Sequence, residues 1–179
     1  MTAPSSADRE IRIREERPDD HAAIHEVVTS AFGGPAEARL VDALRGERSW
    51  RRSLVATAAG EVVGHILFTP VTIDGDAGAG AVGLAPLAVA PGWQRQGVGS
   101  RLVAAGLDFC REDRKRAVVV LGHPAYYPRF GFRRASLLGL TCEFPSDDEA
   151  FMALVFEPDV VIGPGLVRYM ARFSDGLHS

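Results

Sequence analysis

The first half of the chain switches between two hydrophobic periods. Residues 11–16 (IRIREE) alternate apolar and charged side chains, the period of a strand with one buried face. Apolar residues within 23–31 and 35–47 recur every three to four positions, which predicts two amphipathic helices. Two runs rich in β-branched residues, 53–59 and 62–73, flank Gly60-Glu61, and this pattern predicts a hairpin.

The middle of the chain has a strand, helix, strand pattern. Residues 82–90 (VGLAPLAVA) predict a strand, and residues 97–111 place their apolar side chains on one helical stripe. Residues 117–122 (AVVVLG) are all apolar, typical of a strand buried on both faces in a parallel pairing. A further strand is expected at 150–156 (AFMALVF). The pattern predicts an α/β domain over residues 11–157, preceded by a disordered tail at 1–10. Residues 158–179 are expected to form a C-terminal extension packed on or beside the domain.

Composition narrows the class of protein. A chain of 179 residues with 46% hydrophobic residues suits one domain with a real core. A net charge of −3 and a pI of about 5.9 argue against nucleic acid as a partner. No apolar run predicts a signal peptide or a membrane span, so we expect a cytoplasmic protein that binds no membrane.

Neither the cysteines nor the histidines indicate a metal site or a disulfide. Cys110 and Cys142 stand alone, without the spacing of a zinc site or a disulfide framework. His21 and His25 have the i, i+4 spacing of metal ligands but no nearby third ligand. We therefore predict no metal.

The stretch PGWQRQGVGSRL (residues 91–102) places two glycines between the predicted strand and the predicted helix. Such a turn exposes backbone N–H groups at the positive end of a helix dipole, which favours a phosphate. A P-loop would need Gly-Lys-Ser/Thr, whereas Gly97-Val98-Gly99 is followed by Ser100-Arg101. The dinucleotide fingerprint would need a third glycine and would have to lie in the first strand-to-helix turn of the fold. Nucleotide binding by this turn remains an alternative, as does a plain turn.

Two motifs resemble the GNAT superfamily of N-acetyltransferases. The first is Q-x-x-G-x-G at 94–99, preceded by PLAVAP at 86–91 and followed by the amphipathic helix. The second is YYPRFGF at 126–132, with a tyrosine four residues before a Gly-Phe pair. LGHPAYYPRFGF and VVGHILFTPV more narrowly resemble a bacterial subgroup described as YhbS-like. The resemblance implies a twisted, mixed, mostly antiparallel sheet that is flanked by helices and splayed between its fourth and fifth strands.

The resemblance also implies site residues for acetyl-CoA, which would be the cosubstrate. The loop and helix start that match the pyrophosphate site are Gln94, Arg95, Gln96, Gly97, Val98, Gly99 and Ser100, and Arg101 is added as a phosphate partner. The strand that matches the pantetheine site contains Leu87, Ala88 and Val89. Tyr127 matches the general acid that protonates the departing thiolate, and Tyr126 is expected to pack. Arg95, Arg129, Arg133 and Arg134 could also meet phosphates or be solvated surface charges.

The expected reaction is acetyl transfer to a primary amine, either a small molecule or a protein amino group, by direct attack in a ternary complex. The alternative is a CoA-binding sensor or interaction module without turnover. The predicted strand at 82–89 carries no ionisable residue, so no general base is assigned; Glu37, Asp74, Asp76, Glu143 and His123 are conceivable. The acceptor pocket is expected from residues 32–50 and 137–148. A homodimer would fit a covered edge strand near 151–156.

Overall fold

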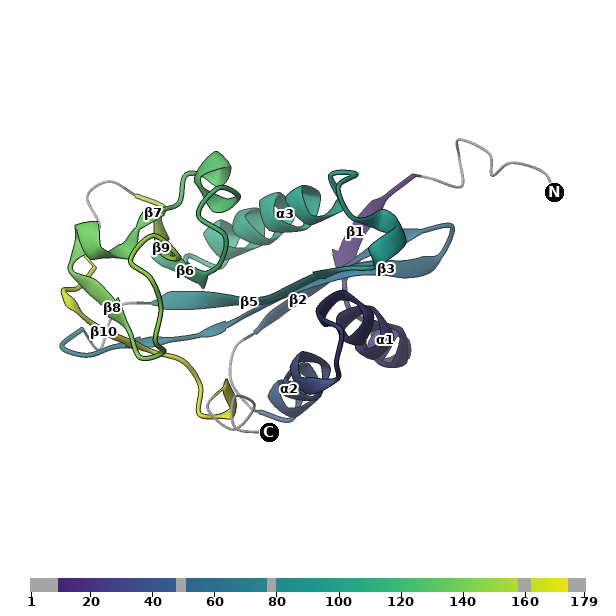
Figure 1. The fold of residues 1–179 in the computed structure, drawn as a ribbon, viewed down its shortest axis with the longest axis horizontal. Helices are drawn as coiled ribbons and strands as arrows, with labels where there is room; N and C mark the ends of the chain where they lie inside the picture. Colours follow the sequence, from purple (N-terminus) through teal and green to yellow (C-terminus); the bar gives the residue numbers. More distant parts are fainter. Residues whose placement is uncertain (1–9, 48–50, 77–79, 158–161, 174–179) are drawn as a thin grey trace.

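The protein is built on a seven-stranded sheet with helices on both faces (Figure 1). The computed structural model describes residues 10–47, 51–76, 80–157 and 162–173. The helices are α1 (His21–Phe32), α2 (Ala36–Arg45) and α3 (Val98–Glu112). The strands are β1 (Arg12–Glu15), β2 (Arg52–Ala58), β3 (Glu61–Pro70), β4 (Thr72–Ile73), β5 (Ala81–Val89), β6 (Ala117–Leu121), β7 (Arg133–Arg134), β8 (Leu140–Cys142), β9 (Phe151–Val155) and β10 (Gly165–Arg168).

The main sheet has the order β1-β2-β3-β5-β6-β9-β7 and is antiparallel except for the β5–β6 pair. A second sheet, β4-β10-β8, joins chain segments that lie far apart in the sequence. The predicted helices, hairpin and central strand, helix, strand unit are all present. The disordered tail expected at 1–10 falls almost wholly outside the described residues. Strand β9, expected at an edge, carries β7 on its outer side at Ala153 and Met152.

The main sheet splits between β5 and β6, as the family resemblance implies for its fourth and fifth strands. Strand β5 pairs with β6 only from Ala81 to Gly83, whereas its pairing with β3 continues to Val89. The β3–β5 register shifts between Ile66 and Phe68, a bulge that bends the strand. Strand β6 meanwhile stays paired with β9 along its whole length. The two strands are therefore held by different neighbours and diverge beyond Gly83.

Helix α3 covers one face of the sheet and is anchored at a glycine. Its buried residues Leu102, Val103 and Leu107 join the core with Phe68 of β3. Gly106 lies against the Phe68 ring, because a Cβ added there would be 2.3 Å from Phe68 Cε2. Burying each of these large side chains contributes about 1.5–3 kcal/mol. This contact fixes α3, and so the position of its N-terminus, relative to β3 and β5.

The opposite face is covered by α1 and α2 and, farther along, by the second sheet (Figure 1). Ile24, Val28 and Leu44 of these helices pack with Val55 and Leu67 of β2 and β3. The chain after β10 enters the same layer, where Met170 and Phe173 pack against this group. Tyr169 packs against both this cluster and the one beneath the second sheet.

A buried polar cluster lies between α2 and the main sheet. Arg45 donates two hydrogen bonds to Glu16, of 3.1 and 3.2 Å, and the Ser53 hydroxyl donates one of 2.5 Å. Because Ser53 gives its only proton to Glu16, the fully buried His65 must donate from Nε2 across the 2.8 Å contact to Ser53 Oγ. His65 Nδ1 then remains an acceptor with no partner among the described residues.

Burial lowers the pKa of His65, and the neighbouring Glu16 opposes this shift only in part. Burial also disfavours the charged form of Glu16, but the nearby His65 and the hydrogen bonds from Arg45 and Ser53 outweigh it and hold the pKa of that carboxyl well below its ordinary value. Both groups bind fewer protons in the folded than in the unfolded chain. The stability they confer is therefore lost on acidification, below about pH 6.5 for His65 and below about pH 4.3 for Glu16.

Gly106→Ala should destabilise the protein by about 1–3 kcal/mol, because its methyl group would press into the Phe68 ring of β3. Urea denaturation measures the change. At an exposed helix position the same substitution would stabilise by about 1 kcal/mol, so a gain of that size would contradict the packing described.

His65→Gln should flatten the fall in stability between pH 6.5 and 5.5, since a neutral side chain removes a proton bound only by the unfolded chain. The loss of slope is bounded at about 1.4 kcal/mol per pH unit. Urea denaturation at several pH values tests this, with the exposed His123→Gln as the matched control. An unchanged slope in His65→Gln would show that His65 is protonated in the folded protein.

Candidate active site

The glycine stretch forms a tight loop between β5 and α3. A short 3-10 turn at Pro91–Trp93 is followed by Arg95 and Gly97, both with left-handed backbones of φ +61° and +83°. Gln96 holds the loop from inside, because its Nε2 donates to the carbonyl of Gly92 at 2.8 Å. The glycine at 97 meets a conformation that most residues avoid, and it lets α3 begin at the next residue.

The N-terminus of α3 offers backbone donors to an anion. Val98, Gly99 and Ser100 are its first three residues, and the first intrahelical bond in this turn runs from Arg101 N to Gly97 O at 3.0 Å. Among the described residues, no side chain caps the helix. The N–H groups of the first turn therefore point outward at the positive end of the helix dipole, as a phosphate requires.

The free edge of β5 faces this helix start. The backbone N–H of Ala90 donates to Val63 O. Because bonding toward the partner strand alternates along an antiparallel pair, the backbone groups of Ala88 also point toward β3, whereas those of Leu87 and Val89 point away from it. No other described strand pairs with β5 at these two residues. Gln94 Nε2 occupies one of their carbonyls, Val89 O, at 2.9 Å. The edge can thus take an extended chain that carries amides.

The loop, the helix and the strand edge converge at Gly99. A Cβ placed on Gly99 would lie 3.0 Å from Tyr126 Oη, 3.6 Å from Val89 Cγ2 and 3.8 Å from Leu87 Cδ2. The Tyr126 hydroxyl lies 3.4 Å from Ser100 Oγ. Tyr126, expected only to pack, thus has its polar end at the N-terminus of α3. The side chain of Ala88 lies on the opposite face, in the layer of α1 and α2.

Tyr127 stands on the β6 side of the split. Its ring covers the end of β6, since a Cβ on Gly122 would be 2.4 Å from Tyr127 Cε2, and it packs edge-on against Tyr126 and Phe132. Only 7% of the residue is exposed. Burial, with a smaller contribution from Tyr126, raises the pKa of Tyr127 above its ordinary value. The phenol is therefore protonated at neutral pH and can act only as an acid or a hydrogen-bonding group.

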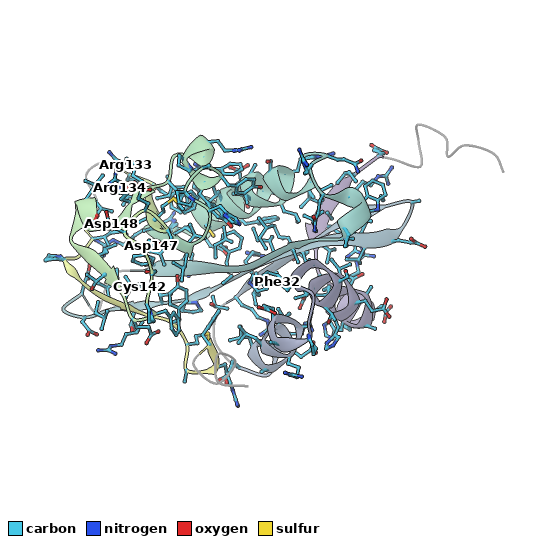
Figure 2. All side chains as sticks on the ribbon, viewed as in Figure 1. Phe32, Arg133, Arg134, Cys142, Asp147 and Asp148 are labelled. Carbon is cyan, nitrogen blue, oxygen red and sulfur yellow. The ribbon has the colours of Figure 1, made fainter. Side chains whose placement is uncertain are left out.

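The arginines that were expected to meet phosphates do not all lie at the same place in the fold. Arg101 donates to Ile11 O at 2.8 Å, and Arg134 lies 3.5 Å from Asp148. Arg133 and Arg134 form β7 at the far end of the sheet, as Figure 2 shows. Arg129 instead stacks on the Tyr126 ring at 4.7 Å and donates to Tyr126 O, so it lies beside the helix start. Arg95 lies in the loop itself.

The residues named as possible general bases also lie in different parts of the fold. Asp74 pairs with Arg168 at 2.9 Å, and Asp76 lies 3.9 Å from Arg116. His123 is exposed after β6. Glu143 is half-buried and accepts the backbone N–H of Tyr169. Of the two segments expected to form the acceptor pocket, 32–50 includes Trp50, which falls outside the described residues.

Other features of the described chain do not add to this site. A hollow of about 520 Å³ lies at the β1 edge of the sheet and is lined by residues such as Glu16, Arg17 and Arg52, none of them a predicted site residue. The described residues contain no group of three or more histidine, cysteine or acidic side chains that could hold a metal ion. Across the same residues, no helix is long and apolar enough to cross a membrane.

Comparison with known proteins agrees with this geometry. The model of the Acetyltransferase (GNAT) family matches residues 13–132. The N-acetyltransferase YhbS of Escherichia coli K12 is 40% identical over 164 residues, which cover 90% of this chain and 98% of YhbS.

Two solved structures are similar over nearly the whole chain. The crystal structure of E. coli YhbS in complex with CoA has a TM-score of 0.87 and 38% identity, covering 97% of this chain and 96% of that one. A GNAT family acetyltransferase from Brucella melitensis in complex with acetyl-CoA has a TM-score of 0.78 and 38% identity, covering 92% and 99%. With a family match over most of its length and a relative at 40% identity, the chain belongs to the GNAT family of acetyltransferases.

Proposed function

We propose that the protein binds acetyl-CoA in the split between β5 and β6 and transfers the acetyl group to a primary amine by direct attack in a ternary complex. The observation that carries the proposal is the unpaired edge at Leu87 and Val89 beside the uncapped start of α3. CoA has two parts that need these features: a pyrophosphate and an arm with two amides. The similar structures from E. coli and B. melitensis contain CoA and acetyl-CoA.

The loop residues Gln94 to Gly97 and the first turn of α3, Val98 to Ser100, would hold the pyrophosphate through their backbone N–H groups. Leu87 and Val89 would pair with the pantetheine arm, and Ala88 would contribute only the strand geometry between them. The absent side chain of Gly99 lets Tyr126 and the open edge of β5 approach the start of α3 closely, since even a single added carbon there would lie 3.0 Å from Tyr126 Oη. Arg95, in the loop, and Arg129, beside the helix start, would meet phosphates, and Arg101 would add the guanidinium N–H groups that its bond to Ile11 O does not use.

The chemistry needs an oxyanion donor and a proton for the departing thiolate. The N–H of Leu87 faces the split and would bind the carbonyl oxygen of the thioester; Pro86 has no N–H to offer. Tyr127 would protonate the thiolate. Ordinary pKa values of about 10 for a phenol and about 8.5 for a thiol make this transfer slightly uphill in water. Burial raises the pKa of both groups, so a dry site does not forbid the transfer.

Gly99→Val should weaken CoA binding at least tenfold, since its branched side chain would fill the space between α3, Tyr126 and Val89. Isothermal titration with CoA and acetyl-CoA measures the change. Ala104→Val, on the exposed face of the same helix, is the matched control and should bind as the wild type does. Equal affinity in the two variants would remove the donor site from this position.

Tyr127→Phe should lower kcat for acetyl transfer by about 10²–10⁴-fold while acetyl-CoA binding stays within about twofold of the wild type. Release of free thiol in the presence of primary amines measures kcat, and calorimetry measures binding. A Tyr127→Phe variant that turns over at the wild-type rate would show that this hydroxyl is not the acid. A wild-type protein that binds acetyl-CoA but never turns over would instead be a CoA-binding module.

A further inference from the structure

The split between β5 and β6 can be approached from two faces. The loop, the start of α3 and the side chains of Leu87 and Val89 all lie on one face, and there they would seat the donor. A nucleophile that reaches the thioester carbon at the same time must come from the other face. That face belongs to α1, α2, the second sheet and the chain after β10 (Figure 1).

Tyr169 occupies this second face at the point where the strands part. A Cβ on Gly83 would lie 2.6 Å from Tyr169 Cε1, and Gly83 is the last residue of β5 that pairs with β6. The ring is held by aromatic neighbours, with centroids 5.5 Å from Phe144 and 5.3 Å from Phe173. Its place beside the split is thus fixed from three sides.

The Tyr169 hydroxyl makes no hydrogen bond that would stabilise the described part of the fold. Its oxygen is inaccessible to solvent and has no hydrogen-bond partner among the described residues. Burial, followed by smaller effects of Cys142, Glu143 and Tyr127, raises the pKa of Tyr169, so this hydroxyl is protonated at neutral pH. A buried hydroxyl without a partner is costly, and a polar ligand would remove that cost.

Glu143 is held next to Tyr169 by the backbone. Its N–H donates to Val167 O at 3.2 Å, one step beyond the β8–β10 ladder, and its Oε1 accepts the N–H of Tyr169. Figure 2 shows the preceding residue, Cys142, on the side of β8 and β10. Arg168 also lies within electrostatic reach of Glu143, but its guanidinium is engaged by Asp74 in two hydrogen bonds of 3.0 and 2.9 Å. A carboxylate held at the backbone of Tyr169 and an unpartnered hydroxyl at the end of its ring therefore both lie on the face opposite the donor.

We propose that Tyr169 and Glu143 form the subsite for the acceptor amine. Tyr169 Oη accepts a hydrogen bond from one N–H of a primary amine, and the Glu143 carboxylate takes the proton that the amine loses. The aromatic side chains around Tyr169 favour an amine on an apolar stem. The inference rests on the proposed acetyl transfer and supplies the base that β5 lacks.

The reaction then balances with the groups named. The amine lone pair attacks the thioester carbon, so a C–N bond forms and the carbonyl becomes an oxyanion at the N–H of Leu87. Glu143 takes one proton from the amine nitrogen. The oxyanion collapses, the C–S bond breaks, and the thiolate takes the Tyr127 proton. Return of the proton from Glu143 through solvent restores Tyr127, and the products are the N-acetyl amine and CoA.

Glu143→Gln tests the proton acceptor, because glutamine keeps the Oε1 that binds Tyr169 N and removes only the charge. The assay follows thiol release from acetyl-CoA with phenethylamine, spermidine and glycinamide, and uses the fastest of these as the probe. We expect kcat/KM for the probe to fall about 100-fold or more, with acetyl-CoA affinity unchanged. Glu61→Gln, at the exposed turn of the β2–β3 hairpin, is the matched control and should behave as wild type.

Tyr169→Phe tests the hydroxyl. We expect KM for the probe amine to rise roughly tenfold with acetyl-CoA affinity unchanged. Thermal unfolding separates this from a structural role. Removing a hydroxyl without a partner should leave Tm unchanged or raise it by about 2–4 °C, whereas a structural hydroxyl would lower it.

Wild-type kcat/KM in both variants would overturn the subsite and leave acetyl transfer intact. Failure of all three amines to accelerate thiol release from bound acetyl-CoA would count against acetyl transfer itself, because the wild type would then behave as a CoA-binding module. Failure of the wild type to bind acetyl-CoA would instead remove the proposed function itself.

Discussion

The parting of β5 from β6 beyond Gly83 is the constraint on which the rest of the structure depends. A strand inside a sheet normally satisfies both of its edges, and an unpaired backbone group that is buried costs about 1–3 kcal/mol. Here β3 holds one edge of β5 as far as Val89, while β9 holds β6 along its length. Neither strand can move to close the gap without breaking its own ladder. The open edge at Leu87 and Val89 is therefore a permanent feature that an amide-bearing ligand can complete.

The two faces of the sheet give this split two different surroundings. On one face, the contact between Gly106 and Phe68 fixes α3 so that its uncapped first turn lies beside the open edge. On the other face, the chain after β10 returns to the sheet and sets Tyr169 against Gly83. The division suits a reaction with two substrates, because a donor and an acceptor can meet at one carbon from opposite sides. Tyr126 and Tyr127, on neighbouring positions of one short turn, separate the start of α3 from the end of β6.

Local pattern was enough to predict the three helices and the longer strands, but not the short strands β7, β8 and β10; the donor side of the site stays a prediction. The strand, helix, strand unit has strong periodicity, and the glycine turn needs only residues adjacent in sequence, so their positions follow from local rules. The residues whose positions the pattern could not give depend on distant contacts. Tyr126 looks like packing in sequence, yet its hydroxyl reaches Ser100 because the turn after β6 folds back over α3. Glu143 and Tyr169 are brought together by the parallel pairing of β8 with β10, a register that no short-range signal specifies. Arg101 and Arg134 each have a partner that the local pattern could not show, a carbonyl and a carboxylate, and their role as phosphate partners stays a prediction.

Amide hydrogen exchange at β5, followed by NMR with and without the CoA ligand, tests most directly whether the open edge of β5 binds the acyl donor. If it is, CoA slows exchange at Val89, and acetyl-CoA, whose thioester carbonyl meets the N–H of Leu87, slows exchange at Leu87 as well; Ala88, which bonds to β3, stays unchanged. The N–H groups of Gly99 and Ser100 should be protected together with them. Protection that appears elsewhere while Leu87 and Val89 exchange at their unliganded rates would contradict the account, even if CoA binds.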